Sequence, residues 1–147
     1  MPEPAIAEFV MPSLKRRLAS MVYESLLLGA LLFIAGYLVV GLRPQDHPGL
    51  FRVYLLAVCG MYFVWFWRHG GQTLAMRTWR IRLVEASGQP ITRRRAWLRY
   101  AYAVAGTLAL GLGFLWALWD RDRLFLHDRL AGTRLQLLAE HDKQSTA

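Results

Sequence analysis

The chain contains very little cysteine and histidine and few acidic residues. Its single cysteine, Cys59, lies inside an apolar run, so the sequence has no disulfide framework and no CxxC metal or redox pair. The four histidines stand far apart, and the sequence contains neither an HExxH zinc motif nor a GxSxG nucleophile motif. We therefore expect no enzyme activity, no cofactor and no metal site.

The adjacent pair His127-Asp128 is a further candidate for metal binding or acid/base catalysis. Two adjacent residues in a strand or a helix seldom face the same ligand, because successive side chains point in different directions. A metal or acid/base site would need them to converge. We therefore interpret His127-Asp128 as a capping or ion-pairing element of the fold.

Apolar residues are abundant and collect in three blocks. Hydrophobic residues make up 55% of the 147 residues, and the mean hydropathy is +0.24. A helix of about 20 residues crosses a hydrocarbon core about 30 Å thick. The blocks therefore predict an all-α integral membrane protein with about three transmembrane helices. Its parts are a tail (1–14), a membrane domain (15–138) with apolar segments 18–40, 50–67 and 97–119, and a C-terminal tail (139–147).

Positive charge surrounds these apolar segments. Lys and Arg number 18 against 10 acidic residues, for a net charge of +8. Three basic residues lie at 15–17 and seven lie between 68 and 95, whereas the 41–49 loop has one. Basic residues concentrate on the cytoplasmic side of bacterial membranes and attract anionic headgroups. We expect a cytoplasmic N-terminus, an outward-facing 41–49 loop, and partners that are lipid headgroups rather than nucleic acid.

The first apolar segment begins as a basic, signal-like stretch but is too long for a signal peptide and lacks a clean cleavage site. We therefore expect it to remain in the mature protein.

The one acidic residue of the first apolar segment is Glu24. Arg17 lies seven residues earlier and therefore on the same helix face, with Ser20 between them. An acid within a span is costly unless it faces protein or water, which makes Glu24 a candidate functional residue. Alternatively, Glu24 lies among the headgroups and only sets the depth of the helix.

The basic loop (68–96) and the amphipathic tail (120–138) contain short strand patterns. Residues 79–83 alternate apolar with basic side chains, which is typical of a half-buried strand, and 86–90 form a turn. We therefore expect a small β-hairpin in the loop. In the tail, leucines alternate with arginines up to Gly132, which predicts an interface-bound segment.

The third apolar segment, 97–119, admits two structures. A small-residue stripe favours one continuous helix packed against a partner, whereas Gly111-Leu112-Gly113 would let the chain turn back into the membrane. Three crossings, which we favour, place the basic tail outside. A re-entrant segment keeps the tail inside, where 134–137 can pair with 79–83. The stripe consists of Ala101, Ala105, Ala109, Gly113 and Ala117.

Several of these features together resemble the RDD family of small bacterial multi-pass membrane proteins, over about residues 14–138. The matching stretches are Arg17-Leu18-Ala19, an acid at position 24, Gly71-Gln72-Thr73-Leu74, 79–88 and His127-Asp128-Arg129-Leu130-Ala131-Gly132-Thr133. The resemblance places the family's arginine on Arg17 and its two aspartates on Glu24 and Asp128. Glutamate therefore replaces the first aspartate, which retains the charge on a longer side chain. The resemblance also implies a location in the bacterial inner membrane and a role in transport.

Two hypotheses of function follow from the residues and the resemblance. In the first, the chain is a transport subunit that works as an oligomer. Glu24 and Asp128 then bind protons or cations, balanced by Arg17, Arg77 or Arg99. In the second, the chain is a membrane accessory or scaffold protein that packs on partner helices and anionic lipid. The three family residues then join the first span to the loop and the tail.

Overall fold

The computed structural model describes residues 10–109 and 111–138 of the chain. Within these ranges the protein is mostly helical and contains one two-stranded sheet. The elements, in chain order, are α1 (Leu14–Leu38), η1 (Val40–Leu42), η2 (Pro44–Asp46), α2 (Pro48–Arg68), α3 (Leu74–Thr78), β1 (Ile81–Glu85), α4 (Arg93–Leu108), α5 (Leu112–Leu115), η3 (Trp116–Leu118), α6 (Leu126–Ala131) and β2 (Thr133–Leu137).

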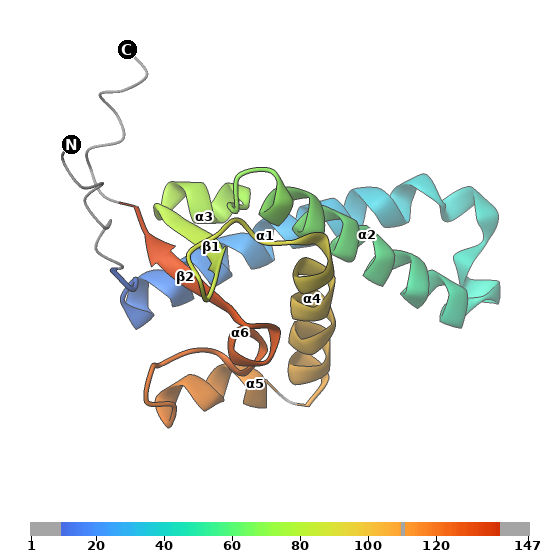
Figure 1. Cartoon of the computed structure of the whole chain (residues 1–147). Coiled ribbons are helices and arrows are strands. Elements are labelled where there is room, and N and C mark those ends of the chain that lie inside the picture. The colour runs from blue at the N-terminus through green and yellow to red at the C-terminus, as the bar shows by residue number, and fades with distance from the viewer. Residues whose placement is uncertain (1–9, 110, 139–147) are drawn as a thin grey trace, which may run out of the picture.

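Helices α1 and α2 form a long hairpin that projects from the rest of the molecule (Figure 1). The Ser13 hydroxyl caps α1 by accepting a hydrogen bond from the Arg16 amide at 3.3 Å. The Tyr54 hydroxyl of α2 donates to the Ala35 carbonyl of α1 at 3.1 Å. Few side chains of the hairpin are buried, and its helices, of 25 and 21 residues, are long and apolar enough to cross a membrane. The first two predicted segments are confirmed as helices of spanning length.

The third apolar segment is not one helix. It is divided into α4 and a shorter piece, α5 with η3, which is bent by 106° relative to α4. Gly111 turns the chain with a φ of 76°, in the left-handed region that glycine adopts readily. Across the bend, a Cβ on Gly106 would lie 3.3 Å from the Gly113 Cα, so the two backbones are in close contact. The glycine-dependent bend is therefore confirmed, whereas a three-span arrangement is not.

The bend also divides the small-residue stripe. Ala101, Ala105 and Ala109 are exposed on α4 and at its end, whereas Gly113 and Ala117 come after the bend and are buried. The prediction of one continuous packing stripe is wrong, because its four-residue spacing marks a single face only while the helix continues unbroken.

The basic loop and the tail together form the sheet. Strand β1 pairs with β2 in antiparallel register, with Ile81 opposite Leu137 and Glu85 opposite Thr133. The predicted hairpin within the loop is not found in the described residues, because the turn after β1 leads into α4 instead. The strand partner comes from the tail, as the re-entrant alternative predicted. The Leu137 amide also donates to the Val10 carbonyl at 2.8 Å, which places the tail beside the start of α1.

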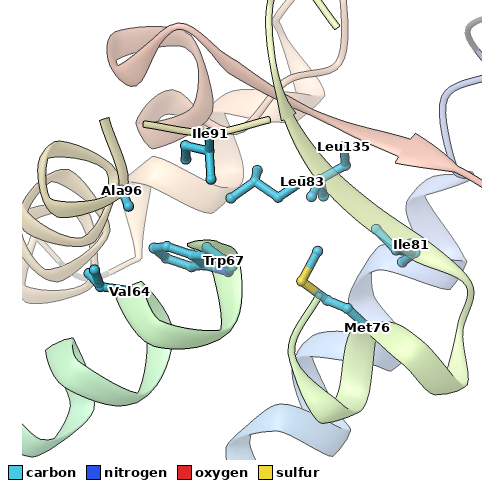
Figure 2. Packing of buried hydrophobic residues seen from close by; sticks show 8 residues of the cluster. All are labelled: Val64, Trp67, Met76, Ile81, Leu83, Ile91, Ala96 and Leu135. Carbon is cyan, nitrogen blue, oxygen red and sulfur yellow. The ribbon is translucent and has the colours of Figure 1, made fainter. Parts of the chain in front are cut away.

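The apolar core lies where the end of α2 meets α3, the sheet and the start of α4 (Figure 2). Trp67, at the end of α2, is 4% exposed, and Ile81 and Leu83 of β1 are each 1% exposed. Alternate residues of β1 face this core, as expected for a half-buried strand. We call α3, β1, α6 and β2 together the cap. The core consists of Val64, Trp67, Met76, Ile81, Leu83, Ile91, Ala96 and Leu135.

Candidate functional site

One face of α1 is polar and buried, and Ala35 is the only other buried residue of that helix. Arg17, Ser20 and Glu24 are 2%, 5% and 8% exposed. Their spacing of three and then four residues stacks them on one side of the helix. The predicted alignment of these residues is therefore confirmed, and this face of α1 lies against protein.

Glu24 links three helices. The Tyr62 hydroxyl of α2 donates to Glu24 Oε1 at 2.7 Å, and the Thr73 hydroxyl donates to Glu24 Oε2. Thr73 is also the N-cap of α3, because its Oγ1 accepts a hydrogen bond from the Met76 amide. The carboxylate of Glu24 thus fixes the start of the cap to both helices of the hairpin. Within the described ranges, both side-chain hydrogen bonds to this carboxylate come from neutral hydroxyls.

Arg17 connects α1 to the segment that precedes α6. Its Nη1 donates to the Arg123 carbonyl at 2.6 Å, and its guanidinium carbon lies 5.0 Å from the centre of the Phe125 ring. This is a cation–π arrangement, which stabilises a charge held away from water. Arg17 Nε is buried and has no hydrogen-bond partner among the described residues. One donor of this buried cation is therefore unused by the described part of the chain.

Arg99 and Asp128 form the most deeply buried ion pair described in the structure. Arg99 Nε lies 2.7 Å from Asp128 Oδ1, and the two residues are 8% and 0% exposed. The guanidinium also lies over the Trp67 ring, 4.3 Å from its centre. The second carboxylate oxygen, Asp128 Oδ2, has no hydrogen-bond partner among the described residues. The pair ties α4 to α6, and Arg99 is one of the cations predicted to balance the acidic residues.

His127 lies next to this pair but does not add a charge to it. Its Nε2 is 3.9 Å from Asp128 Oδ2, and its ring stacks on Phe125 with ring centres 5.5 Å apart. Burial lowers the pKa of His127 to about 4; Asp128 opposes this shift and Arg99 adds to it. The imidazole is therefore neutral at pH 7, and Arg99 is the cation that balances Asp128.

These groups surround a cavity of about 500 Å³ between α1, α2, α4 and the cap. Its lining includes the charged or polar side chains of Arg17, Glu24, Thr73, Arg99 and His127, while most of the other lining residues are apolar. Cavities of this volume are typical of small-molecule sites. The apolar part includes Leu28, Leu56, Val104, Leu108 and Phe114.

The structure assembles most of the predicted site, but not all of it. Arg17, Glu24 and Arg99 line one cavity, and Asp128 pairs with Arg99 beside it. Arg77 is exposed and has no acidic partner within 10–109 and 111–138, so its predicted role as an ion-pair partner is not observed there. Its position on α3 directs it to solvent, because the buried face of that helix carries Ala75 and Met76.

Sequence reasoning missed the hydroxyl groups that hold Glu24. Tyr62 lies among the aromatic residues near the end of α2, a position typical of a membrane interface, yet its hydroxyl is bonded to Glu24. Thr73 gave a clearer signal, because a threonine directly before Leu74-Ala75-Met76 is a typical helix N-cap. That signal predicts the cap on α3, but not the second bond of the same hydroxyl to α1.

The comparisons with known proteins identify the family. The RDD family model matches residues 11–132, a region that contains Arg17, Glu24 and Asp128. No curated protein and no solved structure matches the chain. RDD is a membrane family, in agreement with the two apolar helices of spanning length. The matched region extends from residue 11, just before α1, to Gly132, which ends α6. The chain therefore belongs to the RDD family of membrane proteins.

Proposed function

We propose that this RDD protein is a non-transporting accessory protein of the bacterial inner membrane, in which the family's charged residues hold a cap on a membrane hairpin. The observation that carries the proposal is that each charged residue bonds to a different element. Glu24 joins α1 to α2 and α3, Arg17 joins α1 to the segment before α6, and Asp128 joins α6 to α4. Contacts that join separate elements of the fold in this way are expected of residues with a structural role.

Exposed arginines near the cap indicate what kind of partner this protein binds. Two exposed arginines at helix ends, Arg68 and Arg93, line one groove and have no acidic partner among the described residues. Clustered, unpaired arginines beside membrane helices attract anionic lipid headgroups or an acidic protein surface. The exposed alanines of α4 add a face of small residues for a partner helix.

The proposal includes an orientation in the membrane. The pairing of β1 with β2 requires the basic loop and the tail to lie on the same side, so we infer that the segment between α4 and α6 re-enters rather than crosses. The basic residues at 15–17 support a cytoplasmic location for that side.

Cysteine labelling tests this orientation. Gln45→Cys, Ser87→Cys and Ser145→Cys are each introduced singly into a Cys59→Ala background and labelled on intact cells with an impermeant maleimide. Gln45→Cys, at the hairpin tip, should label, whereas Ser87→Cys in the loop and Ser145→Cys in the tail should label only after the cells are opened. Labelling of Ser145→Cys on intact cells would contradict the re-entrant arrangement.

Ion-coupled transport is a second candidate, because Glu24 lines the cavity and, among the described residues, its two oxygens accept hydrogen bonds only from neutral hydroxyls. A buried carboxylate without a cationic hydrogen-bond partner is a chemically reasonable site for a proton or a metal cation. The cavity within one chain gives no evident route across the hairpin, so this candidate requires several copies of the chain.

Glu24→Gln distinguishes the two candidates. A glutamine amide places a donor against one of the two hydroxyls, so the accessory proposal expects a loss of about 1–3 kcal/mol of stability and a lower protein level. Wild-type protein in vesicles should then give no cation-driven pH change. Tyr23→Phe, on the exposed side of α1 and outside the cavity, is the matched control and should behave as wild type. A wild-type pH change that Glu24→Gln abolishes at an unchanged protein level would instead establish transport.

A further inference from the structure

A second groove lies outside the charged cavity, between the end of α2, the middle of α1 and the start of α4. Its volume is about 630 Å³. At one end are Arg68, His69 and Arg93, and none of its lining residues in the described part of the chain is acidic. Arg93 is also the first residue of α4, where the free amides of a helix favour an anion. This end of the groove is therefore suited to a negatively charged group.

The rest of the groove is apolar and extends towards the middle of the hairpin. It reaches Leu31 on α1 and Val58 and Met61 on α2. Val58 and Arg68 are ten residues apart, which corresponds to about 15 Å along a helix. The hydrocarbon core of one leaflet is half of about 30 Å. The groove thus places a basic end and an apolar end one leaflet apart.

Two tryptophans mark the level of the membrane surface in this groove. Trp65 of α2 is 60% exposed and Trp97 of α4 is 40% exposed, and both line the groove. The His69 ring stacks on Trp65 with ring centres 4.0 Å apart. Exposed tryptophans collect at the headgroup level of membrane proteins, where their rings are partly apolar and their N–H groups meet water. Their position fits a lipid whose headgroup lies at the arginines.

We propose that this groove binds one anionic phospholipid of the cytoplasmic leaflet. The phosphate lies between Arg68 and Arg93, because a guanidinium forms paired, charge-assisted hydrogen bonds with phosphate oxygens. An acyl chain follows Val58 and Met61 towards Leu31. An acidic protein segment would match the two arginines but not the apolar stretch of leaflet length. The inference rests on the proposed function, which assigns the cap to the cytoplasmic side of the membrane. It adds the class of lipid that binds there.

The test is lipid retention by the full chain, purified in detergent and measured by native mass spectrometry. Phosphatidylglycerol and phosphatidylcholine with identical acyl chains are added in equal amounts. Wild-type protein should retain one phosphatidylglycerol in preference to phosphatidylcholine, and Arg68→Gln/Arg93→Gln should reduce that preference at least tenfold. The matched control is Arg77→Gln/Arg94→Gln, which removes the same charge from exposed positions outside the groove and should keep the preference.

Three outcomes would overturn the lipid site. Equal loss of preference in both double variants would mean that the attraction is spread over the basic surface. Competition by glycerol phosphate at the same concentration as the lipid would mean that the arginines bind a free phosphate group. Absence of any preference in the wild type would mean that the groove does not select a headgroup. None of these outcomes depends on ion flux or on Glu24. They would therefore reject the lipid site without rejecting the accessory proposal, which the Glu24→Gln experiment tests.

Discussion

Asp128→Ala is expected to destabilise the protein by about 3–5 kcal/mol, because it leaves the buried guanidinium of Arg99 without its counter-charge. Asp128 is fully buried, and Thr133 Oγ1 donates to the same carboxylate oxygen at 3.3 Å. The neutral His127 ring cannot replace the lost negative charge. We therefore expect α6 to separate from α4 and to take the adjoining strand β2 with it. Thermal unfolding of the purified protein in detergent measures the loss.

The control for this prediction is Asp122, an exposed acidic residue in the segment just before α6. Asp122 lies 3.7 Å from Arg129 with 64% of its side chain exposed, so Asp122→Ala should change stability by less than about 1 kcal/mol. Replacing both members of the buried pair, as in Asp128→Ala/Arg99→Met, should recover part of the loss, since no charge is then left buried. Equal unfolding temperatures for Asp128→Ala and Asp122→Ala would contradict a stabilising role for the pair.

Gly71→Ala is expected to cost about 3 kcal/mol or more, for two reasons that act together. Gly71 has a φ of 72°, a left-handed conformation that a residue with a Cβ adopts only at a cost. In addition, a Cβ at this position would lie 2.5 Å from the Leu83 carbonyl oxygen. The Leu83 amide donates to the Gly71 carbonyl at 2.7 Å, so the two backbones cannot separate without breaking that bond. We expect a low protein level and early unfolding in detergent.

The neighbouring glycine provides a control for the steric part of this effect. Gly70 also has a positive φ, of 103°, but a Cβ there would meet nothing within 4 Å. Gly70→Ala should therefore cost only the conformational part, about 1–2 kcal/mol. If the two variants unfold at the same temperature, the close approach of Gly71 to β1 makes no separate contribution to stability.

The short stretch after α2 illustrates what a sequence pattern can and cannot reveal. Two adjacent glycines predict a turn, and the threonine before an apolar run predicts a helix cap. Both features are present, at Gly70-Gly71 and at Thr73. The sequence does not reveal that Gly71 lies against β1, or that the Thr73 hydroxyl also binds Glu24, because both contacts join residues far apart in the chain.

The third apolar segment shows the same division. Its composition is apolar enough for a membrane-spanning helix, and the stripe of small residues is compatible with a continuous helix. Gly111 permits a bend but does not require one, since glycine is tolerated inside helices at a modest cost. The observed bend of 106° accompanies the pairing of β1 with β2, a contact between remote segments that the third segment by itself cannot specify.

The amino-acid sequence by itself determined the membrane class, the two helices of spanning length, the shared face of Arg17 and Glu24, and the strand pattern after α2. These features are periodic or compositional, so a single segment is enough to specify each of them. Only the tertiary structure decided that Arg99, rather than Arg77, pairs with Asp128, that the tail supplies the second strand, and that Tyr62 and Thr73 hold Glu24. The physical reason is that a buried charge is stabilised by whichever group the folded chain brings within hydrogen-bonding distance, and that distance is set by packing between segments remote in sequence.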